Sequence, residues 1–305
     1  MRFLVIGASG AQGGAAARHL AARGHEVRGF SRTPSSLPEG VRPFPGDLGD
    51  AGRVKEAFDG VTHAAVVLPM VYEAATVSAY VRHVIDAALA AGTRRLVFNT
   101  GNRLPGRPSG VAAFETRRHA AQALLSSGVP TVVLRPPLYA GNLLAPWATG
   151  TAGVLRYPLP AHVAVPWLTH ADLGAITVAA LTRDGLEGAT LDVGGPDAVT
   201  GQELAALSGS GVRYEELDVA AFEAALASVA GREAAAGVAA TYRWIGAAKD
   251  FFATPDDTAA RLGVPLTPLR DWLSARGTGA GKGDEPGRSG GPGTGGEAAR
   301  KGGRA

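Results

Sequence analysis

The stretch GASGAQGG, residues 7–14, follows the apolar run FLVI at residues 3–6 and opens into the alanine-rich segment 15–22. The backbone there must turn sharply out of a strand, approach a pyrophosphate without Cβ interference, and point the free N–H groups of a helix N-terminus at the anion. Three glycines in GxxGxxG spacing meet these needs, although a glycine-rich turn without a ligand would show the same letters. We therefore predict a dinucleotide site at Gly7, Ser9, Gly10, Ala11, Gln12 and Gly13.

Short β-rich runs alternate with longer helical patterns in the first half of the chain, which is typical of βαβ units and a parallel sheet. The predicted strands are 3–6, 26–30, 62–68, 95–99 and 131–134, and the predicted helices are 11–22, 51–58, 72–91 and 112–127. The run AAVVL at residues 64–68 is apolar on both faces, as in a strand covered by helices on both sides. The sequence therefore predicts an α/β fold with a doubly wound parallel sheet, the Rossmann architecture.

The pattern loosens after residue 136. Short strands are expected at 163–168, 189–193 and 212–217, with an alanine-rich helix at 222–240, and we assign them to a smaller C-terminal α/β lobe. The predicted organisation is an NAD(P)-binding domain over residues 1–135, a substrate-binding lobe over 136–275, and a disordered, glycine-rich basic tail over 276–305.

Composition excludes several classes of protein. The 305 residues include no cysteine, so disulfides, zinc–thiolate sites and thiol nucleophiles are excluded, and we predict no metal site. The net charge is +3, of which the tail after residue 277 supplies +2, so we predict no nucleic-acid partner. No apolar run has the length of a signal peptide or a membrane span, which favours a cytoplasmic protein without a membrane partner.

Two further positions bear on the cofactor. Ser31 and Arg32 end the second strand, where NAD-binding proteins usually carry an acidic residue for the ribose 2′-hydroxyl. They are suited to a 2′-phosphate, so NADP(H) is favoured over NAD(H), unless Arg32 is only a solvated loop charge. Asp47 and Leu48 follow the expected third strand and are predicted to contact the adenine, although Asp47 could equally cap the helix beginning near residue 50.

Together these residues resemble the atypical short-chain dehydrogenase/reductase superfamily, and more closely its NmrA-like NAD(P)-binding proteins. The resemblance covers about residues 1–275 and rests on GASGAQGG at 7–14, LRPPLYAGN at 134–142, DLG at 172–174 and GGP at 194–196. It implies a small-molecule substrate and a monomer or homodimer. It also implies that loops after the fourth, fifth and sixth strands line the nicotinamide, through Leu68, Pro69, Met70, Thr100, Gly101, Asn102, Pro136 and Pro137.

The helix expected at 112–127 departs from the superfamily pattern. Short-chain reductases place a Tyr there and a Lys four residues later, whereas this chain has Phe114 and Arg118. A phenyl ring has no proton to give, so the usual mechanism is absent. Many NmrA-like members show Phe-x-x-Lys, and that lysine position matches Arg117. An arginine clamps a hydroxyl or carbonyl oxygen but stays protonated, and both arginines could equally be plain surface charges.

Few residues are available to replace the missing proton donor. Tyr139 follows the sixth strand near the expected nicotinamide position and is our first choice, although a buried aromatic filling the site would show the same pattern. Tyr72 and Tyr80 lie on the helix expected after the fourth strand and are the other candidates. We therefore predict Tyr139, Arg117 and Arg118 as the catalytic residues.

The leading prediction is an NADPH-dependent oxidoreductase that reduces a small hydrophobic carbonyl, enone or quinone. Such acceptors tolerate a missing tyrosine when water or a cofactor-ribose hydroxyl delivers the proton. The alternative is a non-catalytic NADP(H)-binding redox sensor with a regulatory protein partner, which the loss of both the donor and the lysine motivates. An isomerase or cyclase is a third option, for which the sequence has no specific acid/base pair.

Overall fold

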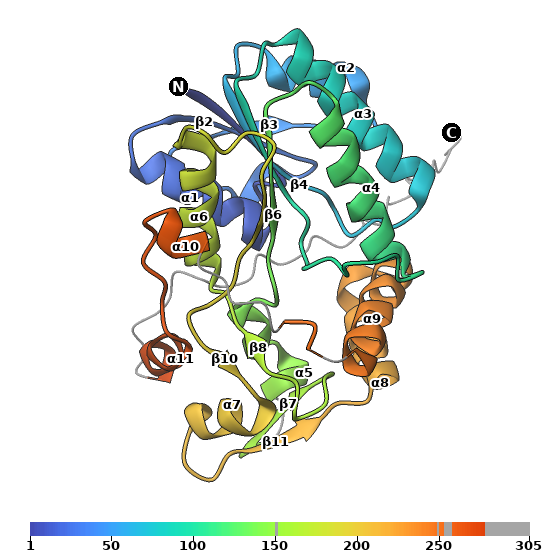
Figure 1. Ribbon diagram of the computed structural model, residues 1–305, viewed down its shortest axis with the longest axis vertical. Coiled ribbons are helices and arrows are strands. Elements are labelled where there is room, and N and C mark those ends of the chain that lie inside the picture. Colours follow the sequence, from blue (N-terminus) through green and yellow to red (C-terminus); the bar gives the residue numbers. More distant parts are fainter. Residues whose placement is uncertain (150–151, 249, 253–257, 278–305) are drawn as a thin grey trace, which may run out of the picture.

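A seven-stranded parallel sheet forms the centre of the molecule (Figure 1), as a computed structural model of residues 1–149, 152–248, 250–252 and 258–277 shows. The strand order is β3-β2-β1-β4-β5-β6-β9. The direction of winding reverses between β1 and β4, which is the point where doubly wound sheets bind their ligands. The predicted Rossmann fold is confirmed. Its strands are β1 Arg2–Ile6, β2 Glu26–Ser31, β3 Val41–Pro45, β4 His63–Val67, β5 Arg95–Asn99, β6 Thr131–Arg135 and β9 Thr190–Asp192.

Helices cover both faces of this sheet (Figure 1). Successive side chains of β1 point to opposite faces, so that Leu4 and Ile6 enter one apolar core while Phe3 and Val5 enter the other. The first core lies under α2 Ala51–Phe58, α3 Ala74–Ala90 and α4 Ala112–Ser126, and the second under α1 Ala11–Ala22 and α6 His170–Thr182. A 3-10 turn, η1 Pro34–Ser36, joins β2 to β3.

The remaining elements form a lobe beyond the sheet (bottom of Figure 1). Two small sheets pair β7 with β11 in parallel and β8 with β10 in antiparallel. Aromatic side chains fill the lobe core, among them Tyr157, Trp167, Phe222 and Tyr242. The lobe elements are η2 Ala140–Leu144, α5 Pro146–Thr149, β7 Val154–Tyr157, β8 Val165–Pro166, β10 Ala198–Val199, α7 Gly201–Ser208, β11 Arg213–Glu216, α8 Val219–Ala230, α9 Arg232–Ala247 and α11 Leu269–Gly277.

The structure corrects two assignments in the second half. The strand expected at 189–193 is β9, which pairs with β6 as the seventh strand of the main sheet and does not belong to the lobe. Its apolar Leu191 faces Leu134, and Asp192 accepts two hydrogen bonds of 2.8 Å from Arg135. The helix expected at 222–240 is two helices, α8 and α9, because Gly231 interrupts it at φ 86°.

The chain returns to the sheet after building part of the lobe. Gly174 of α6 packs so closely on α1 that a Cβ there would lie 2.8 Å from the Ala15 carbonyl oxygen. Asp172 holds the later segment, because its carboxylate accepts hydrogen bonds of 3.0 Å from the Thr267 N–H and hydroxyl. Helix α10 Thr258–Arg261 also contributes Ala259 to the core beneath α6. The division into domains at residue 135 stays a prediction.

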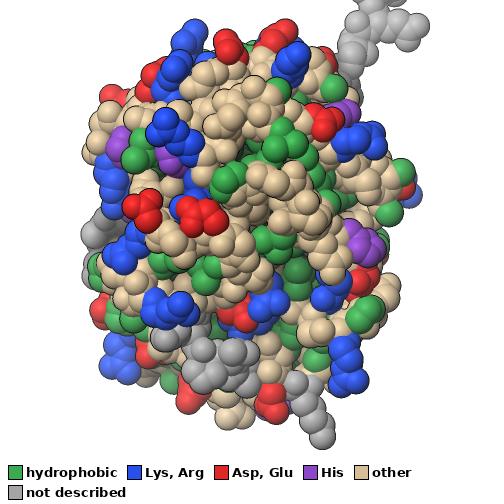
Figure 2. All heavy atoms as spheres, turned by 45° about the horizontal axis from the view of Figure 1, so that its top comes forward, with side chains coloured by type: hydrophobic (Ala, Val, Ile, Leu, Met, Phe, Trp, Pro, Cys, Tyr) green, Lys and Arg blue, Asp and Glu red, His purple; other side chains and the backbone are tan. Residues whose placement is uncertain are grey.

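Of the tail predicted for 276–305, Arg276 and Gly277 end α11, and residues 278–305 lie outside the described part of the chain. Acidic and basic side chains are intermixed on the face shown in Figure 2. Within the described ranges, no helix has the length and apolarity needed to cross a membrane. The same residues hold no cluster of three or more His, Cys, Asp or Glu side chains placed to bind a metal.

Candidate active site

Close backbone contacts require glycine at two positions of the glycine loop, residues 7 and 13. Gly7 leaves β1 at φ 81°, a conformation that L side chains rarely adopt, and its N–H donates to the Phe30 carbonyl at 3.0 Å. The Gly10 N–H donates back to the Gly7 carbonyl at 3.0 Å. A Cβ on Gly13 would lie 2.3 Å from that same oxygen, so α1 approaches the turn only because residue 13 is glycine.

The N-terminus of α1 presents unblocked N–H groups. Its N-cap is Gly10, and among the described residues no side chain caps it and no acidic residue occupies its first turn. Ser9, Ala11 and Gln12 are partly exposed beside it. Free N–H groups and the positive end of the helix dipole form a site suited to a pyrophosphate. The glycine loop thus has the shape and polarity that a dinucleotide requires.

The residues predicted for the adenosine end lie together at the carboxyl edge. The Ser31 hydroxyl is buried without a hydrogen-bond partner among the described residues, and Arg32 beside it is exposed. Burial and Asp47 raise the pKa of Tyr80 while Arg32 lowers it, which places both charges near one ring. An orphaned hydroxyl next to an exposed guanidinium fits a ribose 2′-phosphate.

Asp47 does not cap α2. Asp50 does so, because its carboxylate accepts the Arg53 N–H at 3.0 Å, so the capping alternative for Asp47 is wrong. Asp47 accepts instead from the Gly49 N–H at 2.7 Å, in an exposed turn. Leu48 is buried behind it.

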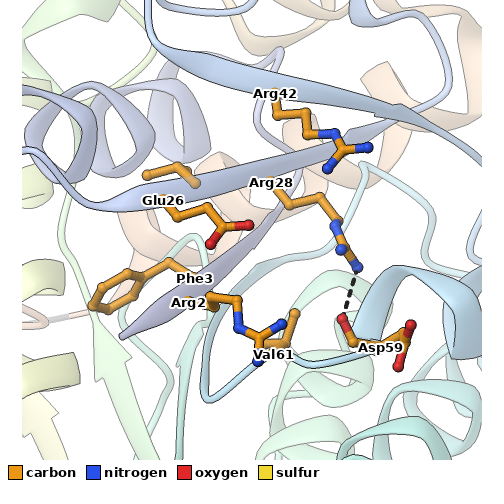
Figure 3. Close-up of a pocket in the computed structure, with 8 residues that line it drawn as sticks. Arg2, Phe3, Glu26, Arg28, Arg42, Asp59 and Val61 are labelled. Atoms are coloured by element: carbon orange, nitrogen blue, oxygen red, sulfur yellow. Dashed lines mark hydrogen bonds between the residues drawn. The ribbon is translucent and has the colours of Figure 1, made fainter.

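A pocket at the other end of the strands is a different feature (Figure 3). Its volume is about 10 Å³, and Arg2, Glu26 and Arg42 line it at the amino ends of the first three strands. Arg28 spans it and donates to the Ala57 and Asp59 carbonyls at 2.6 and 3.2 Å, which caps the end of α2. Parallel sheets bind ligands at their carboxyl ends, and a cavity of this size holds about one water molecule.

Loops after β4 and β5 approach the glycine loop at the carboxyl edge. Leu68 is buried and Met70 is 46% exposed, with Pro69 between them. Gly101 and Asn102 are partly exposed, whereas Thr100 is buried, and its N–H donates to the Leu134 carbonyl at 3.0 Å. Pro136 and Pro137, directly after β6, are also buried.

Asn99 is a residue that the sequence reasoning missed. Its amide donates to the Gln12 side chain at 3.0 Å and accepts from the Gly101 N–H at 2.8 Å. It therefore joins the glycine loop to the loop after β5. A polar residue ending an apolar strand was the available signal.

Tyr139 lies beneath this link. Its ring stacks on His170 with centroids 5.0 Å apart, and its buried hydroxyl makes no hydrogen bond of normal geometry with any described residue. Burial raises the pKa of Tyr139 far above its usual value, and nearby Asn99 offsets a part of this rise. The burial agrees with the alternative of an aromatic that fills the site, and the donor role stays a prediction.

Arg117 is buried, so the alternative of a plain surface charge is wrong for it. Its guanidinium donates to the Pro69 carbonyl and, at 3.1 Å, to the Val71 carbonyl, and it lies 5.3 Å from the Tyr72 ring centre. Burial lowers the pKa of Arg117, and Tyr72 offsets a part of this decrease. Arg117 thus ties α4 to the loop after β4.

Arg118 ties α4 to the loop after β5 in the same way. Its guanidinium donates to the Pro105 and Arg107 carbonyls at 2.6 and 3.0 Å and to the Glu115 carboxylate at 3.1 Å. The two neighbouring arginines therefore each hold one of the loops expected to line the nicotinamide. Contact of either with a substrate stays a prediction.

Phe114 lies in an aromatic cluster between α4 and α9. It is fully buried, with Trp244 at 5.5 Å and Phe251 at 5.9 Å between ring centres. The Tyr72 ring also packs against α9, so closely that a Cβ on Gly237 would lie 2.1 Å from it. Phe114, the position at which the short-chain reductase pattern predicts a tyrosine, is therefore covered by aromatic side chains of the lobe.

The strand order, the glycine loop and the open helix N-terminus together define a Rossmann-fold protein with a dinucleotide-type site. The chain belongs to the NmrA-like family, whose sequence pattern matches residues 1–253. The predicted resemblance is confirmed.

Individual relatives cover nearly the whole chain. It is 35% identical over 283 residues to the (4-alkanoyl-5-oxo-2,5-dihydrofuran-3-yl)methyl phosphate reductase of Streptomyces griseus. The match covers 88% of this chain and 96% of the relative. The triphenylmethane reductase of Citrobacter sp., complexed with NADP(H), has a similar fold, with a TM-score of 0.74, 22% identity, and coverage of 90% of this chain and 99% of that one. The NADPH-dependent quinone oxidoreductase of Escherichia coli, complexed with NADPH, also has a similar fold, with a TM-score of 0.67 and 25% identity. The match covers 90% of this chain and 99% of that one.

Proposed function

We propose that this protein is an NADPH-dependent oxidoreductase that reduces a small hydrophobic carbonyl, enone or quinone. The relative from Streptomyces griseus is named as a reductase and the similar structure from Escherichia coli as a quinone oxidoreductase, which supports this class of reaction. The proposal includes a small-molecule substrate, a cytoplasmic location and a monomer or homodimer.

The residues present fit a nicotinamide dinucleotide. The α1 N-terminus with Gly7, Gly10 and Gly13 would hold the pyrophosphate, and Ser31 with Arg32 would hold the 2′-phosphate. Residues 68–70, 100–102 and 136–137 would line the nicotinamide end. When bound, NADPH supplies a hydride to the acceptor. The single observation that carries the proposal is the unblocked α1 N-terminus at the sheet's switch point, with an orphaned Ser31 hydroxyl beside it.

NADPH consumption against a panel of quinones and enones tests the proposal, with binding of NADPH and NADH followed by fluorescence in the same samples. We expect saturable oxidation of NADPH with at least one acceptor. Tight NADPH binding without turnover of any quinone, enone or aldehyde would contradict the reductase.

A redox sensor is the second proposed function, and the identity of Phe114 favours it, because no tyrosine hydroxyl is present at that position. A sensor must distinguish the two redox forms of its ligand. We would compare partner binding and protease sensitivity with NADPH and NADP⁺. Identical behaviour with both forms and no partner would exclude the sensor.

A further inference from the structure

We propose that Tyr72 is the proton donor of this protein and that Arg117 positions and polarises it. The inference rests on the proposed reductase function and names the residue that replaces the missing tyrosine of α4. Tyr72 belongs to the loop after β4, two residues beyond Met70, and precedes α3, which begins at Ala74.

The ring of Tyr72 makes two close contacts with other elements. Arg117 of α4 lies 5.3 Å from the ring centre, within the range of a cation–π contact. The ring also meets the α9 backbone at Gly237, where a Cβ would lie 2.1 Å away. A side chain in contact with both a guanidinium and a helix backbone has little freedom, which is what general acid catalysis requires of a donor.

Arg117 also fixes the segment that carries the ring. It donates to the carbonyls of Pro69 and Val71, on both sides of Met70 and directly before Tyr72. One cation therefore orients the loop expected beside the nicotinamide and the phenol at the end of that loop. The fully buried Phe114 lies three residues before Arg117 on the same helix, so the phenol is supplied from the neighbouring loop.

The electrostatics separate Tyr72 from Tyr139. Burial raises the pKa of Tyr72 while Arg117 lowers it, so the phenol is protonated at neutral pH and has a cation beside the charge that donation would leave. Asn99, a neutral amide, is the group that lowers the pKa of Tyr139. Among the described residues, the Tyr139 hydroxyl is fully buried and has no hydrogen-bond partner. The Tyr72 hydroxyl does not combine full burial with the lack of a partner in that part of the chain.

The step balances as follows. As the hydride reaches the acceptor, an electron pair moves onto the acceptor oxygen, the phenol O–H bond of Tyr72 breaks, and a new O–H bond forms on that oxygen. The phenolate left on Tyr72 is stabilised by Arg117 and recovers a proton from water. No further oxidant or reductant is needed.

The first experiment compares acceptors with different proton requirements. A naphthoquinone takes up a proton with the hydride, whereas a triarylmethane dye cation accepts a hydride alone. We expect Tyr72→Phe to lower kcat for the quinone about 100-fold, the usual size of general acid catalysis, with KM for NADPH unchanged. Turnover of the dye cation should be unaffected. Tyr214→Phe, which removes a hydroxyl bonded to Leu159 in the lobe, is the matched control.

The outcomes are distinguishable. Loss of quinone turnover with retained dye turnover supports Tyr72. Quinone turnover at the wild-type rate in Tyr72→Phe, an equal loss with both acceptors, or a large loss confined to Tyr139→Phe overturns the assignment and leaves the reductase intact. A wild-type protein that oxidises NADPH with neither acceptor overturns the reductase and the assignment together.

A second readout needs no cofactor. Tyrosine labelled with ¹³C at Cζ reports ionisation of each phenol by NMR in the ligand-free protein, and Tyr72→Phe identifies the signal of Tyr72. We expect Arg117→Met to raise the midpoint of that titration and Arg117→Lys to restore it in part, because a cation returns to the site. An unchanged midpoint in Arg117→Met would show that the cation does not act on the phenol.

Discussion

Gly13 and Gly7 approach so closely that a Cβ atom on Gly13 would lie 2.3 Å from the Gly7 carbonyl oxygen. We expect Gly13→Ala to cost about 1–3 kcal/mol of folding stability through overpacking and to weaken NADPH binding, because the turn must move away from α1. Thermal unfolding and fluorescence titration measure the two effects. Gly106→Ala is the control, since a Cβ there would contact nothing within 4 Å. A Gly13→Ala protein with wild-type affinity would show that the turn does not touch the ligand.

Arg32 is exposed next to the orphaned Ser31 hydroxyl. Arg32→Ala should raise Kd for NADPH by about tenfold to a hundredfold, in line with the loss of a charge-assisted hydrogen bond of roughly 1.5–3 kcal/mol, and leave Kd for NADH unchanged. Arg42→Ala removes an exposed cation at the opposite edge of the sheet and controls for net charge. If Arg32→Ala keeps the wild-type preference for NADPH over NADH, the basis for the predicted NADP(H) specificity is removed.

Arg117 satisfies two carbonyls of the loop after β4. Arg117→Ala should destabilise the fold by about 3 kcal/mol, because hydrogen bonds to a charged group contribute roughly 1.5–3 kcal/mol each and two are lost, although the Pro69 carbonyl keeps its bond from the Val71 N–H. Urea unfolding measures this cost. Arg118→Ala should cost less, because the Arg118 side chain is 18% exposed and its hydrogen bond to the Arg107 carbonyl is open to solvent. Equal costs would indicate that burial of Arg117 does not matter.

Phe114 is enclosed by Trp244 and Phe251. Phe114→Tyr should therefore not raise turnover of any acceptor, and the added hydroxyl should cost about 1–3 kcal/mol if it finds no partner. Steady-state kinetics and thermal unfolding test both statements. An increase in kcat would mean that the aromatic cluster opens toward the substrate.

His63 and His19 give the stability a defined dependence on pH. Burial, and then Arg95, lowers the pKa of His63, while burial, and then Arg23, lowers that of His19. Unfolded histidine titrates near about pH 6.5, so on acidification the unfolded chain binds protons first. Stability should be fully present above that pH and fall as pH decreases toward the lowered native values.

Urea unfolding at about pH 7.5 and about pH 5.5, on either side of the unfolded value, measures this slope. His63→Gln should flatten part of it. The same slope in wild type and in His63→Gln would place the acid sensitivity elsewhere.

The elements of the first half were predictable because each carries a strong local signal. Helix α1 begins directly after Gly10, α2 begins after the capping residue Asp50, and β5 is an apolar run that the structure places at 95–99 as predicted. Ser31 and Arg32 were predicted as cofactor contacts because they lie at the end of a recognisable strand.

Other parts depend on contacts between residues distant in sequence. The place of β9 follows from its pairing with β6, across a separation of 57 residues between Arg135 and Asp192. The tasks of Arg117 and Arg118 depend on which carbonyls the loops present, and no spacing along α4 encodes that. The link between Asn99 and Gln12 likewise joins residues 87 positions apart.

The seventh strand has a consequence for how the molecule can be divided. Because β9 lies beyond β6 in the sheet, a fragment of residues 1–135 would leave β6 as an open edge and uncover the face that α6 shields. Such an edge invites pairing with other chains. The sheet is thus completed only after the chain has built η2, α5, β7 and β8 of the lobe. That part of the lobe is inserted between two strands of the sheet and cannot be removed as an appended module.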